Sequence, residues 1–195
     1  MNKNKYFYLS RKNKKFSENS NLEGFHGNYG AGILFLSKNT NRFLILKRSN
    51  KVHAPGTWSI PGGAFDPLKE KASQAAKREC LEETGYDCNN IIDFIPSYTY
   101  SSPENTFKYY NFIATVPEEF EPNLNEENRT YRWLDFEELL DFENKHFGLE
   151  EFINNEFSNL ERLSRKDCFN INESNSITIS EKQLKSIIKR ILISR

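Results

Sequence analysis

Apolar residues recur along the chain with two different spacings, one typical of strands and one typical of helices. Together they predict a mixed α/β domain. Short apolar runs bounded by turn residues are typical of buried strands, as in GAGILFLS from Gly30 and FLILKRS from Phe43. The polar segment 39–41 between these runs predicts a hairpin turn. Further strands are predicted at residues 91–100, 107–116 and 131–134.

Helical spacing appears between and after these strands. A narrow stripe of small residues predicts a central helix that lies close on the sheet: Ala72, Ala75, Ala76 and Cys80. Gly85 can adopt a positive φ and is a natural stop for this helix. A second helix is predicted to begin near Asp135, and residues 149–163 predict a third, amphipathic one. The pattern alone leaves the topology of the sheet open.

We divide the chain into a basic lead at residues 1–27, a domain at residues 28–145 and a C-terminal extension at residues 146–195. Six basic residues of the lead precede the first acid, Glu18. Such an arm either contacts RNA or another polyanion, or is a solvated terminus. The second interpretation is favoured, because terminal segments are usually solvated.

The extension holds a polar linker, DCFNINESNS, and then an amphipathic tail helix that the capping-box spacing of Ser180 and Gln183 predicts. Basic residues cover the face opposite its apolar stripe, so the helix can pack on its own domain, self-associate, dock on a partner or lie on a membrane surface. Self-packing or self-association is favoured. The tail is also similar to short terminal helices of some bacteriophage proteins, which keeps a viral source open.

Length and composition favour one domain with appendages. The 195 residues, 14% of them aromatic, suffice to bury one sizeable core. The 27 basic and 27 acidic side chains balance, so no net field recruits nucleic acid or a membrane. The three cysteines show no paired spacing, and the start of the chain lacks an apolar run of signal-peptide or membrane-span length. We expect a cytoplasmic location, in the host cytoplasm if the source is viral, and no structural zinc.

Three acidic residues, Glu79, Glu82 and Glu83, fall on one face of the predicted central helix. Carboxylates at positions i, i+3 and i+4 repel one another, and Mg²⁺ or Mn²⁺ relieves that repulsion. A bare E-x-x-E-E is more often a solvated helix face. We interpret the trio as a metal site whose acids face outward, toward the substrate, because its surroundings carry a longer motif.

The surroundings resemble the Nudix box, G-x5-E-x7-R-E-U-x-E-E-x-G-U, in which U is a bulky apolar residue. Glu70, Arg78, the acidic trio and Gly85 occupy its polar and closing glycine positions. The opening glycine departs from the pattern, because strict counting places Ala64 there. A one-residue insertion within residues 66–69 reconciles the two and predicts a loop of altered shape.

Similarity to the Nudix family covers about residues 28–145 and implies the Nudix fold, a mixed β-sheet sandwiched between α-helices (an α/β/α sandwich). It also implies an Mg²⁺- or Mn²⁺-dependent hydrolase that cleaves the pyrophosphate linkage of a nucleoside diphosphate derivative by attack of water on phosphorus. The substrate stays open among nucleotide sugars, ADP-ribose, oxidised or ordinary nucleoside triphosphates, dinucleoside polyphosphates and RNA 5′ ends, with a small nucleotide favoured. Glu79, Glu82 and Glu83 would hold the metal. Glu79 and Glu83 are favoured as direct ligands, because they lie one helical turn apart.

The resemblance also assigns roles around the trio. Glu70 and Arg78 would form a structural ion pair between loop and helix. Gly62 and Gly63 would let the backbone approach a charged ligand without a side chain in the way. Arg48, at the end of a predicted strand, would contact substrate phosphate through its planar guanidinium.

The general base is sought in the polar loop before the last strand. Glu127 is the first candidate, as base or as an extra metal ligand, and Glu82 of the metal site is the alternative. Five aromatic residues are candidates to stack on a nucleobase, although aromatic residues at strand spacing are usually core: Trp58, Phe65, Tyr98, Tyr100 and Tyr109. His53 is a loop histidine, more often incidental than catalytic.

Two other functions stay open. An RNA 5′-end pyrophosphohydrolase would use the basic lead and tail to hold RNA. A non-catalytic nucleotide sensor of Nudix fold would bind its ligand without turnover, and the intact acidic trio argues against it. A small nucleotide is therefore the favoured partner, with RNA as the alternative.

Overall fold

The computed structural model describes residues 28–165, and the predicted basic lead and tail helix lie outside this range. Its strands are β1 (Tyr29–Ser37), β2 (Phe43–Arg48), β3 (Trp58–Ser59), β4 (Gly62–Ala64), β5 (Asp93–Ser101), β6 (Lys108–Val116) and β7 (Asn128–Leu134). Its helices are α2 (Ala72–Thr84), the short 3₁₀ helix η1 (Cys88–Asn90), α3 (Phe136–Asp141) and α4 (Phe147–Ser164).

Within residues 28–165, seven strands join into one mixed sheet with the order β3-β2-β1-β6-β5. β1 runs parallel to β6, whereas β4 pairs antiparallel with the start of β1 and β7 pairs antiparallel with β2. The predicted hairpin is present, with Leu36 of β1 opposite Phe43 of β2 next to the turn. Farther from the turn the two strands separate, because β1 pairs with β4 and β2 pairs with β3 and β7.

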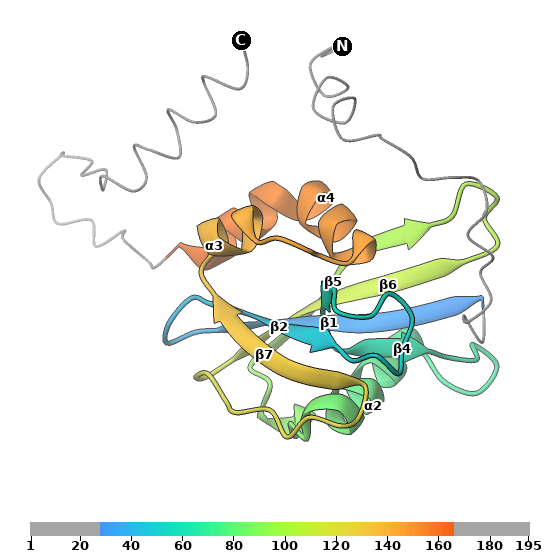
Figure 1. Cartoon of the computed structure of the whole chain (residues 1–195), viewed down its shortest axis with the longest axis horizontal. Coiled ribbons are helices and arrows are strands. Elements are labelled where there is room, and N and C mark those ends of the chain that lie inside the picture. Colours follow the sequence, from blue (N-terminus) through green and yellow to red (C-terminus); the bar gives the residue numbers. More distant parts are fainter. Residues whose placement is uncertain (1–27, 166–195) are drawn as a thin grey trace, which may run out of the picture. The chain divides into compact units, whose positions relative to one another are not determined.

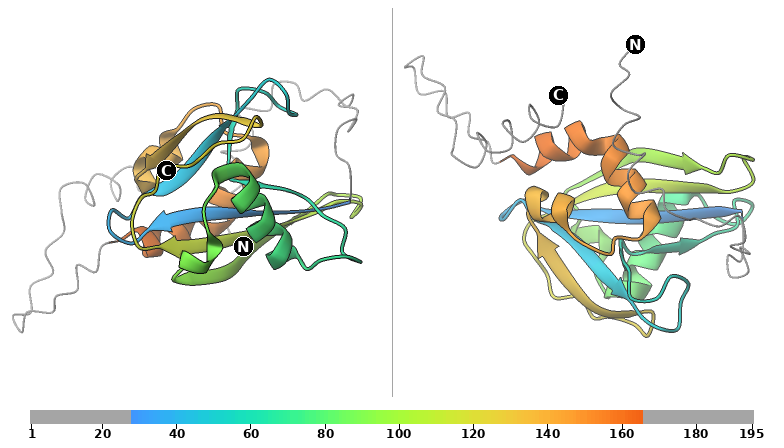
Figure 2. Two further views of the ribbon diagram at one scale, coloured as in Figure 1. Left: turned by 90° about the horizontal axis from the view of Figure 1, so that it is seen from below. Right: turned by 45° about the horizontal axis from the view of Figure 1, so that its top comes forward.

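Helices cover both faces of the sheet, which confirms the predicted α/β/α sandwich. Helices α3 and α4 lie on one face and α2 lies on the other (Figures 1 and 2). Side chains of β1 alternate accordingly: Leu34 and Leu36 belong to the core cluster of Phe152 in α4, whereas Ile33 and Phe35 belong to the cluster of Ala75 in α2. Burial on both faces explains why this strand is continuously apolar in the sequence.

Helix α2, which carries most of the box residues, has a defined start and stop. At its start the backbone N–H of Lys71 donates to Oε1 of Gln74 at 2.9 Å. Gly85 ends it in the left-handed conformation, with φ 67°, and the Gly85 N–H donates to the Leu81 carbonyl. Ala75, Ala76 and Cys80 are fully buried, so the small-residue face lies close on the sheet as predicted.

A turn over residues 67–69 lies between β4 and α2, within the segment where the sequence predicts a one-residue insertion. Asp66 closes this turn: its carbonyl accepts hydrogen bonds from the N–H groups of Lys69 and Glu70, and its carboxylate accepts one from Leu68 N–H at 3.0 Å. Leu68 is left exposed. The loop therefore differs locally from the box pattern while still delivering Glu70 to the start of α2.

Helix α4 contributes to the core beneath α3. Leu149, Phe152, Ile153 and Leu160 pack in the same apolar cluster as β1 and β2. Residues 147–164, which the sequence pattern assigns to the C-terminal extension, thus cover one face of the sheet (Figure 2). No helix within residues 28–165 is long and apolar enough to cross a membrane.

Candidate active site

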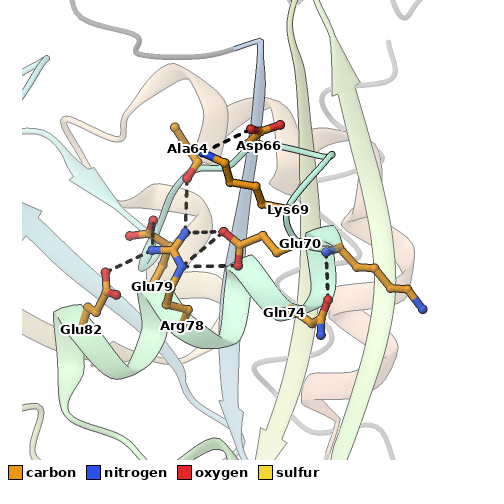
Figure 3. Close-up of polar contacts among 9 residues, drawn as sticks. Ala64, Asp66, Lys69, Glu70, Gln74, Arg78, Glu79 and Glu82 are labelled. Carbon is orange, nitrogen blue, oxygen red and sulfur yellow. Dashed lines mark hydrogen bonds and ion pairs between the residues drawn. The ribbon is translucent and has the colours of Figure 1, made fainter.

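Arg78 organises the carboxylates on and beside α2 (Figure 3). Its Nη2 donates to Glu70 Oε1 at 2.9 Å, so the predicted ion pair between loop and helix is present. Its Nη1 donates to Glu79 Oε1 at 2.8 Å and to Glu82 Oε2 at 3.2 Å. Nη2 also donates to the Ala64 carbonyl at 3.4 Å. One guanidinium thus ties three acids and the end of β4 together.

Glu83 is the buried acid of the trio, with 5% of the residue exposed, so the expectation that all three acids face outward is wrong for this residue. Its Oε1 accepts a hydrogen bond from Gly62 N–H at 2.9 Å, and its Oε2 accepts one from Asn128 Nδ2 at 2.6 Å. Burial, opposed by these hydrogen bonds and aided by the charges of Glu127 and Glu79, raises the pKa of Glu83 to about 7. Its inward position is held from two strands, by the Gly62 N–H of β4 and by the Asn128 side chain of β7.

Glu79 also lies against β4, with 15% of its side chain exposed. A Cβ atom at Gly63 would lie 2.5 Å from the Glu79 Cδ, so this carboxylate needs glycine opposite it. Burial raises the pKa of Glu79, the Arg78 hydrogen bond lowers it, and the charges of Glu82 and Glu127 raise it. Two acids are therefore held close to β4 in partly desolvated, like-charged surroundings.

Glu127 approaches these acids from a different part of the chain, the loop before β7. Its charge contributes to the raised pKa of both Glu79 and Glu83, so it lies on their side of the domain. Two backbone contacts hold it there: its carbonyl accepts from Ser49 N–H at 2.7 Å, and its N–H donates to Asn125 Oδ1 at 3.0 Å. Its catalytic role stays a prediction.

Arg48 ends β2 at a register shift, and its Nε donates to the His53 carbonyl at 2.8 Å. Its positive charge acts on two groups of the site, Tyr109 and His146. Burial, together with the charges of Arg48 and His53, lowers the pKa of His146 to about 4. Arg48 therefore lies near the phenol of Tyr109 and the imidazole of His146, and its contact with substrate phosphate stays a prediction.

Tyr109 fills a trough in the sheet that three glycines leave open. A Cβ at Gly30 would lie 2.5 Å from the Tyr109 ring, and a Cβ at Gly32 or Gly62 would lie 2.4 Å from its hydroxyl oxygen. Burial, followed by the charge of Glu83, raises the pKa of Tyr109. The glycines of β1 and β4 thus admit a phenol beside the buried acid.

Three of the five predicted stacking candidates pack in or against the core: Trp58, Phe65 and Tyr98. The other two join an aromatic cluster of Tyr100, Phe107, Tyr109 and Phe147. Ring centroids are 6.4 Å apart for Tyr100 and Phe107, 6.1 Å for Tyr100 and Phe147, and 6.4 Å for Phe107 and Tyr109. Phe147 is 47% exposed, so the cluster runs from the glycine trough to the surface.

The acids do not form a preassembled cage. Among residues 28–165, no three His, Cys, Asp or Glu side chains group closely enough to hold an ion, since Arg78 engages Glu79 and Glu82 while Glu83 is hydrogen-bonded elsewhere. The donor set nevertheless fits a hard divalent cation: all donors are carboxylate oxygens, and burial and repulsion raise the pKa of two of them. The Glu82 side chain is 54% exposed, so breaking its ion pair with Arg78 costs little free energy.

Two contributors have no clear signal in the sequence. Asn128 contacts Glu83 because the β2–β7 pairing brings it opposite Arg48 at an irregularity in the register. His146 reaches the site because its N–H donates to the Trp58 carbonyl at 2.7 Å, beside the edge strand β3. A polar residue directly after the Glu126–Glu127 pair is the one sequence feature that could have drawn attention to Asn128.

The sequence matches the NUDIX domain family over residues 28–155. An uncharacterized 17.7 kDa protein of Enterobacteria phage T4 is 32% identical over 98 residues, covering 47% of this chain and 61% of its own. A putative 8-oxo-dGTP diphosphatase 3 of Mycobacterium tuberculosis is 28% identical over 124 residues, covering 60% and 57%. Nucleoside triphosphatase NudI of Escherichia coli K12 is 28% identical over 120 residues, covering 55% and 83%. The chain thus spans about three fifths of the length of the first two relatives.

Solved structures share the fold. A C. elegans Ap4A hydrolase in a binary complex superposes with a TM-score of 0.54 at 22% identity, covering 68% of this chain and 98% of that one. A MutT protein from Methanosarcina mazei Go1 gives 0.54 at 23% identity, covering 73% and 100%. Nudix hydrolases generally use divalent metals such as Mg²⁺. The family match, the sandwich and the position of the box on α2 agree, and the chain belongs to the Nudix family.

Proposed function

We propose that this protein hydrolyses the pyrophosphate linkage of a small nucleoside diphosphate derivative and requires Mg²⁺ or Mn²⁺. The observation that carries the proposal is the approach of Glu79 and Glu83 to the glycines of β4, with the charge of Glu127 acting on both. Charged carboxylates held together in a desolvated place are costly unless a cation joins them. Two relatives carry the names of a nucleoside triphosphatase and a putative 8-oxo-dGTP diphosphatase, which supports a nucleotide substrate.

Glu79, Glu82 and Glu83 are the residues that would hold the cation. When bound, a divalent cation neutralises phosphate oxygens and lowers the pKa of an attacking water. Glu83 would have to release its proton near neutral pH, because burial raises its pKa to about 7. Arg78 keeps Glu79 oriented toward β4 and holds Glu82 by a longer contact, so the two acids differ in how freely they turn.

Glu127 is the proposed general base. Within residues 28–165 no ion pair engages its carboxylate, in contrast to Glu126, which binds Lys51 at 2.6 Å. A base must be able to accept a proton from water, and an unpaired carboxylate on a fixed backbone meets that need. The contacts with Ser49 and Asn125 fix that backbone.

Arg48 and the aromatic cluster would orient the substrate. Arg48 offers a planar guanidinium to a phosphate on the side of Tyr109 and Glu83. The exposed ring of Phe147 and the neighbouring Tyr100 offer apolar faces on which a nucleobase would stack. Phosphate and base would then lie at the two ends of one cluster.

The test is a substrate panel of nucleoside triphosphates, ADP-ribose and nucleotide sugars, with Mg²⁺ or Mn²⁺, that identifies the phosphate and nucleoside monophosphate products. Glu127→Gln should lower turnover by about 10²–10⁴-fold, the usual share of a general base. Glu126→Gln is the matched control and should keep wild-type turnover, because its carboxylate pairs with Lys51. Equal rates for both variants would remove Glu127 from the mechanism, and a wild type inactive on the whole panel would contradict the proposed function.

A further inference from the structure

Two cysteines, Cys80 of α2 and Cys88 of η1, contact one another although their sequence spacing does not predict a pair. The Sγ atoms of Cys80 and Cys88 are 3.4 Å apart, and both residues are free thiols. Cys80 is fully buried in α2, whereas Cys88 opens η1 and is half-buried. The left-handed turn at Gly85 reverses the chain, which brings η1 alongside the helix it has just left.

Further contacts hold the two sulfurs toward one another. Cys88 Sγ lies 3.6 Å from the Lys77 carbonyl of α2, and Cys80 Sγ lies 3.7 Å from Thr84 Oγ1. The hydrogen bond shared with Cys80, and the positive charge of Lys77, lower the pKa of Cys88. Since the thiolate is the reactive form and Cys88 is the more accessible thiol, an oxidant would meet Cys88 first.

We propose that Cys80 and Cys88 form an oxidisable pair that closes to an intramolecular disulfide. Bond formation brings the sulfurs from 3.4 Å to about 2.05 Å, a movement of roughly 1.4 Å. The three residues of η1 supply this movement, because none of them is buried and η1 is capped by the single side chain of Asp87. The pair does not depend on the proposed catalytic function.

The oxidant class is a peroxide. The Cys88 thiolate attacks one oxygen of hydrogen peroxide, the O–O bond breaks, and Cys88 becomes a sulfenic acid while the other oxygen leaves as water after taking a proton. The Cys80 sulfur then attacks the Cys88 sulfur and expels hydroxide, which takes the Cys80 proton and leaves as a second water. Two thiols are oxidised, and one peroxide is reduced to two waters.

The resulting ring has a direct relation to the candidate site. It encloses residues 80–88, including Glu82, Glu83 and Gly85, so the bond would restrain the last turn of the helix that presents the acids. A thiol reductant would open it again. The site of modification therefore lies on the same helix turn that carries the acidic trio.

The test uses the full chain carrying Cys168→Ser, which removes the third thiol, outside residues 28–165. After hydrogen peroxide treatment, the chain is unfolded in urea with a maleimide present, which blocks buried and exposed free thiols alike, and the digest is analysed by mass spectrometry. The expected result is loss of both thiols and a linked peptide pair, Cys80 to Cys88, that dithiothreitol reverses. The added substitution Cys88→Ser should leave Cys80 as a free thiol, and a thermal melt checks that this variant is folded.

Three results would overturn the inference. The first is maleimide labelling of both cysteines in the peroxide-treated chain, and the second is a Cys88 sulfinic acid without a link. The third is a link that forms as fast in the urea-unfolded chain as in the folded chain, because the folded contact would then have no part in it.

Discussion

Glu83 gives the folded protein a pH dependence that one substitution should remove. Its pKa is about 7 in the fold, against an ordinary value of 4.5. Between these two values the folded chain keeps a proton that the unfolded chain has lost. The unfolded state then binds fewer protons, so the contribution of Glu83 to stability falls as the pH rises from 4.5 to 7. Above pH 7 the loss is complete.

The gap between the two pKa values corresponds to about 3 kcal/mol of unfolding free energy, at about 1.4 kcal/mol per pH unit. Glu83→Gln cannot ionise and removes this loss. The new amide group accepts from Gly62 or from Asn128 but not from both, so one buried donor loses its partner at a cost of about 1–3 kcal/mol. That cost is independent of pH, which separates the two effects.

Urea unfolding in the presence of a chelator, near pH 4.5 and pH 8, measures the difference. The stability difference between wild type and Glu83→Gln should change by about 3 kcal/mol between the two pH values. Glu82→Gln lies next to it on α2 and retains Glu83, so it should keep the wild-type pH dependence. If wild type and Glu83→Gln respond to pH alike, Glu83 is not a protonated, desolvated acid, and the electrostatic description of the site is wrong.

Other residues of the site give further predictions. Because burial lowers the pKa of His146 to about 4, its contribution to stability is present above its ordinary value of 6.5 and is lost as the pH falls toward 4. In the same urea measurements, His146→Gln should remove this loss of stability at acid pH. A variant that loses as much stability at acid pH as the wild type would contradict the prediction. Gly63→Ala places a Cβ 2.5 Å from the Glu79 Cδ and should lower cation-dependent turnover while the thermal midpoint stays close to that of wild type. Arg78→Lys removes the guanidinium group that joins Glu70 and Glu79, and it should lower the free energy of unfolding by about 1 kcal/mol in a thermal melt. Equal stability of variant and wild type would mean that these hydrogen bonds add nothing.

The apolar pattern predicts the sandwich because strands and helices space their buried apolar residues with different periods along the sequence. Phe43 and Ile45 point to one core cluster while Leu44 and Leu46 point to the other, as continuous burial of β2 requires. The small-residue face of α2 and its stop at Gly85 follow from local chemistry in the same way.

Burial of Glu83 does not follow from local chemistry. It depends on β4, a strand with two glycines, and glycine carries no side chain by which a pattern could mark a strand or its neighbours. The spacing on α2 shows that three acids share a face of the helix. Which of them contacts the sheet depends on how the helix is rotated about its axis where it packs on that strand.

Asn128 and His146 depend on distant parts of the chain. A register irregularity positions Asn128, and an edge contact with Trp58 positions His146. Such long-range geometry is set by packing of the whole domain rather than by the residues themselves.

The central claim is that the acids of α2 bind a divalent cation against a pyrophosphate. Calorimetric titration of Mg²⁺ into wild type and into Glu79→Gln, each with a non-hydrolysable nucleoside diphosphate analogue, tests it without relying on turnover. We expect saturable Mg²⁺ uptake by the wild type and an affinity at least about tenfold weaker in the variant. No uptake by the wild type, or equal affinity in both proteins, would contradict it.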